Sequence, residues 1–131
     1  RVIAKNDSLL AYCPFASPMS MLVRVTSIDH CQRFDQLSDA NIEAVARMVG
    51  RITSWLEQLH PNVAYNVLLH SRPPGLNGAR DAFHWSIDIF PRLTRIAGFE
   101  FSSHSMINPV LPEVAAARYR TCALAEDPRM L

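Results

Sequence analysis

The chain has 131 residues, of which 49% are hydrophobic and 19% are charged, and its formal net charge is +1. A chain of this length can bury one hydrophobic core but not two ordinary ones, so we expect a single domain over residues 1–131. The arginines are scattered, with no basic stripe interleaved with aromatic residues, which argues against nucleic acid as the main partner. No apolar run approaches the roughly 20 residues of a membrane-spanning helix, so no membrane partner is expected.

The three cysteines, Cys13, Cys31 and Cys122, are odd in number and widely spaced. This pattern fits neither a paired disulfide framework nor a Cys-x-x-Cys metal site, and it predicts reduced thiols in a cytoplasmic protein. The chain begins with Arg1 rather than Met, and its first residues are typical of a strand. We therefore expect a piece of a longer polypeptide.

The first third of the chain has the pattern of short strands. Residues 2–4 and 9–13 are predicted strands joined by the turn-forming Asn6-Asp7-Ser8, and residues 21–26 form a third, partly β-branched strand. A long helix is predicted from the N-cap Ser38 to the stop at Pro61. Its expected apolar stripe, at steps of three and four residues, comprises Ile42, Val45, Val49, Ile52, Leu56 and Leu59.

The second half resumes strand character at residues 63–69 and again in the strand-like run of residues 81–92, with a loop at 71–80 that contains Pro-Pro-Gly and Asn-Gly. A last, short helix is predicted from Pro112 to about Cys122, because proline is tolerated in the first turn. The order of strands, long helix, strands and short helix indicates the α+β class, with one long and one short helix packed on a mostly antiparallel sheet.

The most informative stretch is residues 81–92. Period-two alternation places polar side chains on one face of the expected strand and apolar ones on the other. The polar set is His84, Ser86 and Asp88, and the apolar set is Phe83, Trp85, Ile87 and Ile89. Such a strand presents proton-transferring or metal-binding groups while its other face anchors it to a core.

Several motifs along the chain, in this order and at this spacing, carry a resemblance to a known family. They are residues 14–17, 65–70, 83–92, 97–100 and 107–109, followed by Pro112-Glu113. Together they resemble the second, degenerate half of galactose-1-phosphate uridylyltransferase and related sugar-phosphate nucleotidylyltransferases. The resemblance implies a histidine-triad-like fold and a position in the C-terminal half of a two-domain protein.

The resemblance also implies an activity for the whole protein, the transfer of a nucleoside monophosphate between a nucleoside diphosphate sugar and a sugar 1-phosphate, as in galactose metabolism. The nucleophilic histidine lies in the N-terminal half of these enzymes. Here the corresponding position is Ser86, so we expect no catalytic residue in this chain and no activity from it alone. The implied partners are the N-terminal catalytic domain, a nucleotide sugar, a sugar 1-phosphate and a second copy in a homodimer.

The expected substrate contacts lie in and after the loop around residues 97–100. The resemblance assigns them to Arg95, Gly98, Phe99, Glu100 and Asn108. The residue types suit the role, since glycine permits close backbone approach, a carboxylate accepts hydrogen bonds from sugar hydroxyls, and arginine binds phosphate through its planar fork. Arg92 is also available for a phosphate.

A metal site is the remaining expectation. The resemblance places the ligands of a structural zinc or iron at His70, His84 and the position of Ser86. Because serine replaces one ligand, the site is expected to bind a divalent metal weakly. The alternative is that both histidines are hydrogen-bonded structural residues.

Two further hypotheses remain. The chain could be a stand-alone, non-catalytic module that binds a nucleotide or a sugar phosphate. It could also be a small hydrolase in which His84 activates Ser86, although a serine hydroxyl needs a base within hydrogen-bond reach.

Overall fold

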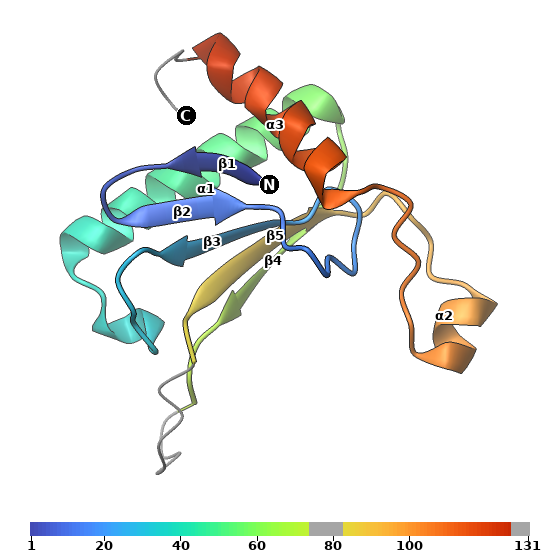
Figure 1. The fold of residues 1–131 in the computed structure, drawn as a ribbon, viewed down its shortest axis with the longest axis horizontal. Helices are drawn as coiled ribbons and strands as arrows, with labels where there is room; N and C mark the ends of the chain where they lie inside the picture. Colours follow the sequence, from blue (N-terminus) through green and yellow to red (C-terminus); the bar gives the residue numbers. More distant parts are fainter. Residues whose placement is uncertain (74–82, 127–131) are drawn as a thin grey trace.

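A five-stranded antiparallel sheet forms the centre of this computed structural model, which describes residues 1–73 and 83–126 (Figure 1). The strands are β1 (Val2–Lys5), β2 (Leu9–Tyr12), β3 (Val23–Ser27), β4 (Tyr65–His70) and β5 (Ser86–Pro91). Their order across the sheet is β1-β2-β3-β5-β4, so that β5 lies between β3 and β4. The predicted strands are confirmed, with bounds shifted by a few residues. Part of the predicted loop at 71–80 lies outside the described residues.

The opening hairpin follows from the side chain of Asn6. Its Oδ1 accepts hydrogen bonds from the backbone N–H groups of Ser8 and Leu9, at 3.0 and 2.7 Å. An Asn side chain that bonds the backbone two or three residues ahead stabilises a tight turn. The turn therefore sets the pairing of β1 with β2, as the sequence predicts.

Helix α1 (Asp39–Leu59) is capped as expected, since the Ser38 hydroxyl accepts a hydrogen bond from the N–H of Asn41. Its buried side chains are Val45, Met48, Ile52, Trp55 and Leu56. The predicted stripe is thus only partly right, because Ile42 is 41% exposed while Met48 and Trp55 are buried. The buried face is rotated slightly from the predicted one to bury the large indole of Trp55.

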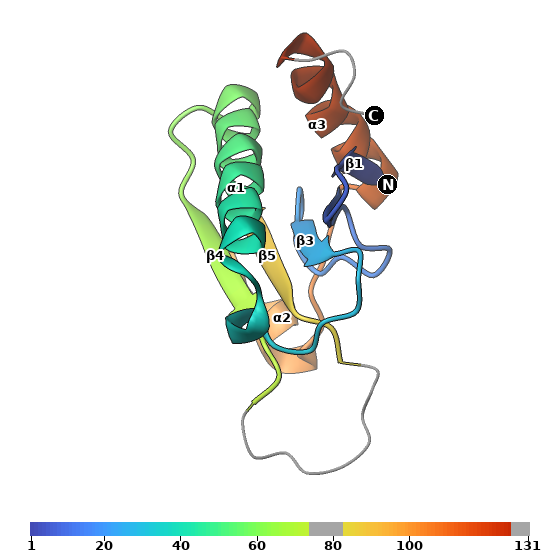
Figure 2. The same cartoon turned by 90° about the vertical axis from the view of Figure 1, so that its left-hand side faces the viewer.

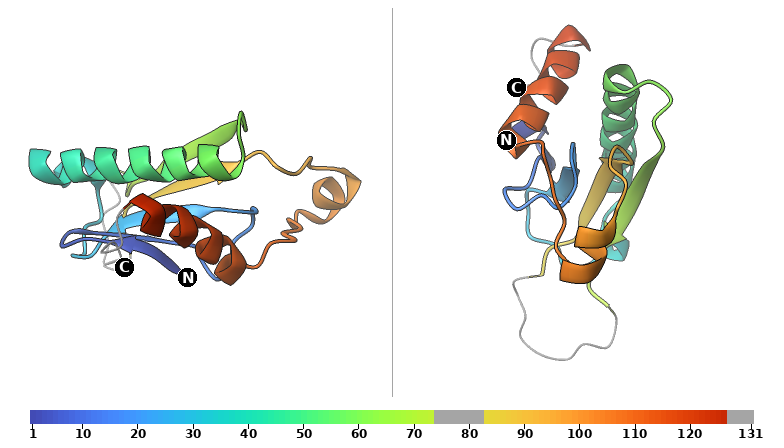
Figure 3. Two further views of the ribbon diagram at one scale, coloured as in Figure 1. Left: turned by 90° about the horizontal axis from the view of Figure 1, so that it is seen from above. Right: turned by 90° about the vertical axis from the view of Figure 1, so that its right-hand side faces the viewer.

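Helix α3 (Pro112–Glu126) packs against α1 and β1. Its buried Tyr119 hydroxyl donates a hydrogen bond to the carbonyl of Met21, at 2.9 Å. Figures 2 and 3 show α1 running along the sheet beside β4 and β5 and α3 close to β1. The helix extends beyond the predicted end at Cys122. None of the helices described is long and apolar enough to cross a bilayer.

Two elements differ from the sequence prediction. A single 3-10 turn, η1 (Phe34–Gln36), occurs in the expected polar loop. Residues expected to form a loop at 97–100 instead begin the six-residue helix α2 (Gly98–Ser103), which projects away from the sheet (Figure 1). The cause is local, because Glu100 Oε2 accepts a hydrogen bond from the N–H of Ala97 and so satisfies a free donor at the first turn.

The core between α1 and the sheet yields a stability prediction. Ile52→Ala should lower the free energy of unfolding by about 3 kcal/mol, because Ile52 is fully buried and its loss leaves a cavity. Ile42→Ala, the same change on the exposed side of the helix, should cost less than about 1 kcal/mol. Urea denaturation followed by circular dichroism measures both, and equal losses would contradict the packing described.

Candidate functional site

The two faces of the sheet carry different residues. Val23 and Val25 of β3 and Ile87 and Ile89 of β5 are buried toward the helices. By strand alternation, Arg24, Ser86 and Asp88 therefore point to the opposite face, which α1 and α3 leave uncovered. In the neighbouring strand, His70 lies opposite Ser86 and Leu68 lies opposite Asp88. We call this surface the open face.

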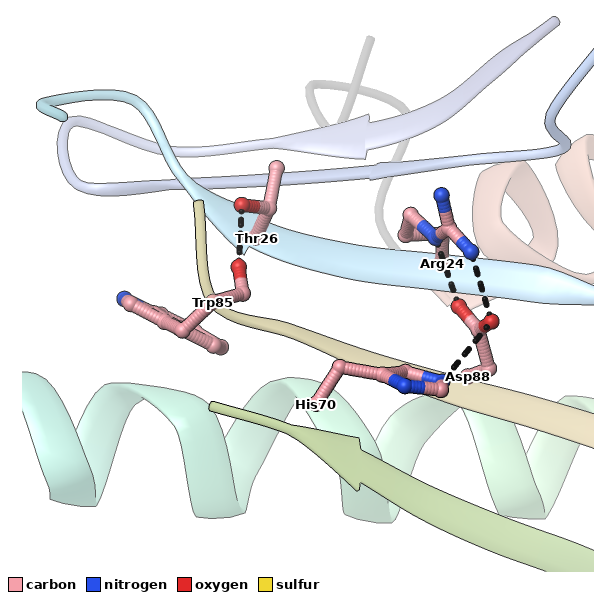
Figure 4. Close-up of polar contacts among 5 residues, drawn as sticks. All are labelled: Arg24, Thr26, His70, Trp85 and Asp88. Atoms are coloured by element: carbon pink, nitrogen blue, oxygen red, sulfur yellow. Dashed lines mark hydrogen bonds and ion pairs between the residues drawn. The ribbon is translucent and has the colours of Figure 1, made fainter. Parts of the chain in front are cut away.

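An ion pair dominates the open face (Figure 4). The Arg24 guanidinium donates two hydrogen bonds to the Asp88 carboxylate, both at 2.7 Å, and His70 Nε2 lies 3.4 Å from Asp88 Oδ2. The Asp88 side chain is only 8% exposed. The hydrogen bonds to Asp88 raise the pKa of Arg24 above its ordinary value. The buried carboxylate is thus paired and neutralised, as a structural charge needs to be.

His84 does not join this cluster. Strand β5 begins at Ser86, so the prediction that His84 shares a strand face with Ser86 and Asp88 is wrong. Its Nε2 forms a 2.8 Å hydrogen bond with the Ser27 hydroxyl, and its ring meets that of His30 edge to face at 5.4 Å. Burial, with a smaller effect of His30, lowers the pKa of His84. The hydrogen-bonding nitrogen of His84 is therefore turned to Ser27 and not to Ser86.

The residues expected to hold a metal do not form a ligand set. Within residues 1–73 and 83–126, no group of three or more His, Cys, Asp or Glu side chains is placed to hold a metal ion. His70 contacts Asp88, and His84 contacts Ser27. The Asp88 carboxylate beside His70 is already bound by Arg24, so the donors present do not fit a divalent metal. The weak metal site at His70 and His84 that the sequence suggests stays a prediction.

Two of the three cysteines, Cys13 and Cys122, are poor candidates for a nucleophile, because burial raises the pKa of each thiol. All three are free thiols. Burial raises the pKa of Cys13 to about 12, so this thiol is protonated at neutral pH. Only the thiolate is a good nucleophile.

The predicted substrate residues fall into three places. Gly98, Phe99 and Glu100 lie in α2, where the Phe99 side chain is 56% exposed. The Asn108 side chain forms its hydrogen bonds within the domain, because its amide N–H groups donate to the carbonyls of Ser17 and Met19, at 2.9 and 3.3 Å. Its carbonyl oxygen accepts from the Ser20 hydroxyl and from the N–H of Val110.

Arg95, the fifth predicted residue, lines a pocket of about 640 Å³ where β4 begins and β5 ends. The lining residues are Met19, Ala64, Asn66, Phe90, Pro91, Arg92, Thr94, Arg95 and Ile96. Sequence reasoning missed Asn66, Phe90 and Thr94. Asn66 and Phe90 are directly paired across β4 and β5, so the register of these two strands would have identified both as neighbours. Register becomes known only once the strands are aligned.

The Arg24–Asp88 pair predicts a context-dependent loss of stability. Asp88→Asn should lower the free energy of unfolding by about 2 to 3 kcal/mol, because it leaves Arg24 without its counter-ion; the figure is moderated by the partial exposure of Arg24. The matched change Asp35→Asn breaks the pair between Asp35 and Arg33 at the protein surface and should lower the free energy of unfolding much less, because solvent screens that pair. Chemical denaturation distinguishes them, and a loss below 1 kcal/mol for Asp88→Asn would contradict a structural role.

The lowered pKa of His84 predicts an acid-dependent loss of stability. Unfolded histidine has a pKa of about 6.5, and the folded value is lower. Below about pH 6.5 the unfolded chain takes up a proton that the folded chain resists, so stability is full above this pH and falls as the pH decreases. Thermal unfolding between pH 7.5 and 5.5 should show a smaller decline for His84→Asn than for the unchanged protein. His104→Asn, at an exposed position, should leave the decline unaltered.

This chain has relatives among known proteins. No family model matches the chain. ADP-glucose phosphorylase of Arabidopsis thaliana is 25% identical over 124 residues, which are 94% of this chain but 35% of that protein. The chain thus spans about a third of the length of this curated relative.

Solved structures agree with this match. The crystal structure of the Arabidopsis thaliana enzyme with bound ADP-glucose superposes with a TM-score of 0.87 at 25% identity, over 91% of this chain and 39% of that one. A uridylyltransferase gives 0.85 at 21% identity, over 95% and 41% of the chains. A zinc-bound histidine triad family protein from Mycobacterium smegmatis gives 0.66 at 16% identity, over 97% and 86%, and shows the fold alone. The chain therefore has a histidine-triad-like fold and is homologous to part of ADP-glucose phosphorylase and of a galactose-1-phosphate uridylyltransferase-like protein of Arabidopsis thaliana.

Proposed function

We propose that this chain is the C-terminal half of a two-domain nucleotidyltransferase that acts on a nucleoside diphosphate sugar and a sugar 1-phosphate. The observation that carries the proposal is the match of 94% of the chain to only 35% of an enzyme named for ADP-glucose. In the proposed reaction a histidine nitrogen of the N-terminal half bonds to the α-phosphorus as the bond to the bridging oxygen breaks. The sugar 1-phosphate leaves, and the incoming phosphate oxygen then displaces the histidine.

The open face supports placing that nucleophile in the other half. Ser86 is 8% exposed, His84 is hydrogen-bonded to Ser27, and His70, which lies opposite Ser86, contacts Asp88. Asp88 is occupied by Arg24. Within the described residues, a hydrolase built on His84 and Ser86 lacks the contact between histidine and serine that it needs. We therefore propose that the chain alone is inert.

The edge strand β4 supports a second domain as partner. All six of its residues are exposed, and the side chains of Tyr65, Val67, Leu68 and Leu69 are 45% to 51% exposed. Proteins usually blunt an exposed edge strand with charged residues or proline, and β4 has neither. An apolar edge of this kind is suited to strand pairing or packing, and we assign it to contact with the N-terminal domain.

The projecting segment that includes α2 supports a substrate-facing role in a homodimer. Phe99 and Phe101 are 56% and 71% exposed on a helix that points away from its own sheet. One carboxylate oxygen of Glu100 caps the helix, which leaves the other for the hydroxyls of a sugar. We propose that Gly98, Phe99 and Glu100 reach the active site of a second copy, and that Asn108 supports them by anchoring the following segment.

A stand-alone binding module is the second candidate. The pocket beside Arg92 and Arg95 favours it, because that pocket is formed within this chain and needs no other domain. The two candidates differ in whether the natural protein carries a nucleophile outside these residues.

A labelling experiment on the full-length protein tests the first candidate. Its mass should exceed twice the 14.7 kDa of this chain. ADP-glucose or UDP-glucose labelled at the α-phosphorus should leave an acid-labile label on a histidine outside this chain. A label within residues 1–131, or a natural protein near 14.7 kDa, would exclude the half-enzyme. The nucleotide that labels identifies the base.

Substitution of Glu100 tests the substrate-facing role. Glu100→Gln should lower kcat/KM for the sugar 1-phosphate at least about tenfold, since a hydrogen bond to a charged group is lost. Glutamine can still cap the helix, so the fold is kept. Glu126→Gln, the same change on the exposed end of α3, should alter kcat/KM less than twofold. Equal effects of the two changes would contradict the assignment.

A further inference from the structure

One arginine binds both oxygens of the Asp88 carboxylate on the open face. Arg24 Nε donates to Oδ1 and Arg24 Nη2 donates to Oδ2, each at 2.7 Å (Figure 4). His70 Nε2 lies 3.4 Å from Oδ2. Two ligand atoms of a tetrahedral zinc ion, with bonds of about 2.1 Å, lie about 3.4 Å apart, so the histidine and the carboxylate have the spacing of two metal ligands. The cation that this carboxylate binds, however, is a guanidinium.

Strand register holds this arginine against the carboxylate. Arg24 of β3 is the direct partner of Asp88 of β5. The next pair along, Val23 and Ile89, is fully buried in the core under the helices. A shift of β3 by one residue would turn its apolar side chains outward, so the register is fixed. The guanidinium therefore stays within reach of the carboxylate.

Ser86 is a neighbour of both His70 and Asp88 on the open face. It lies directly opposite His70 across β4 and β5, and two residues before Asp88 on the same strand. Directly opposed side chains of an antiparallel pair are about 5 Å apart at Cβ. A histidine at this position would therefore bring a third ligand to the same point, whereas a serine hydroxyl is not among the usual zinc ligands.

The charge of Arg24 already meets the need for a cation at this point. The Asp88 side chain is 8% exposed, and a buried carboxylate needs a cation beside it. Arginine supplies this charge permanently, since a guanidinium is not deprotonated in proteins. A divalent metal would have to displace two charge-assisted hydrogen bonds, and the guanidinium would repel it.

We propose that Arg24 takes the place of a divalent metal in this domain, so that its guanidinium, and not zinc or iron, is the cation that Asp88 and His70 share. A histidine restored at Ser86 is then not enough to bind a metal, because the arginine still holds the carboxylate. The weak metal site at His70 and His84 that the sequence suggests predicts the opposite. The inference concerns a cluster formed within this chain and does not rest on the proposed function.

Zinc titration of the full-length protein, with elemental analysis after dialysis, tests the proposal. Ser86→His alone should bind no more zinc than the unchanged protein. The double variant Arg24→Ala/Ser86→His should gain a zinc site with a Kd at least about tenfold lower than any site gained by Ser86→His, because changing a partner of a metal ligand alters affinity about 10- to 100-fold. Adding His70→Asn to the double variant should abolish this site. Adding His104→Asn, at an exposed position, should leave it intact.

Thermal unfolding supplies a second measurement. Zinc should raise the Tm of the double variant more than that of the unchanged protein, because a metal that binds only the folded state stabilises it. A double variant that is unfolded without zinc and folds when zinc is added supports the proposal. One that stays unfolded contradicts it, since the metal then fails to replace the arginine.

Three results would overturn the proposal. The first is a zinc site in Ser86→His alone with the affinity of the double variant, and the second is a folded double variant that gains no site. The third is a loss of bound zinc or iron when His70→Asn is made in the otherwise unchanged protein, a test that leaves Arg24 and Asp88 in place. A full-length protein without nucleotidyl transfer would contradict the proposed function and leave these three results as they are.

Discussion

Strand β5 is the element on which the rest of the structure depends, because it lies between β3 and β4 and presents different residues on its two faces. Ile87 and Ile89 are buried with the core under the helices. Ser86 and Asp88 are buried on the open face, where Asp88 is held by Arg24 of the neighbouring strand. A strand that buries both its faces cannot shift its register by one residue, since the shift would place the carboxylate in the apolar core.

The open face is consequently a structural surface over most of its length. The Arg24 guanidinium forms an ion pair with Asp88, and His70 contacts the same carboxylate. Ion pairs of this kind neutralise a buried charge at little net gain in stability, and the Asp88 carboxylate that Arg24 binds is not free to serve as a metal ligand. Two of the polar side chains that look reactive in the sequence, His84 and Asp88, are thus hydrogen-bonded to neighbouring residues, Ser27 and Arg24. This is consistent with the proposal that the nucleophile of a nucleotidyl transfer lies in another domain of a longer protein.

Two outward-facing surfaces of this chain expose large apolar side chains. The β4 edge exposes apolar side chains, and α2 carries Phe99 and Phe101 away from the body. We propose the N-terminal domain as the partner of the β4 edge and a second copy as the partner of α2.

The sequence by itself determined the strand and helix order, because turn residues such as Asn6, the Ser38 cap and the periodic apolar residues act locally. It also indicated the histidine-triad-like fold, because several motifs occur in one order along the chain, and the comparisons confirm that fold. Only the tertiary structure decided which polar groups meet. His84 and Ser86 are two residues apart, but the start of β5 between them separates their environments. Asp88 and Arg24, 64 residues apart, are joined by strand register, as are Asn66 and Phe90 in the pocket wall. Register depends on long-range pairing and core packing, which act between segments whose alignment no local pattern encodes.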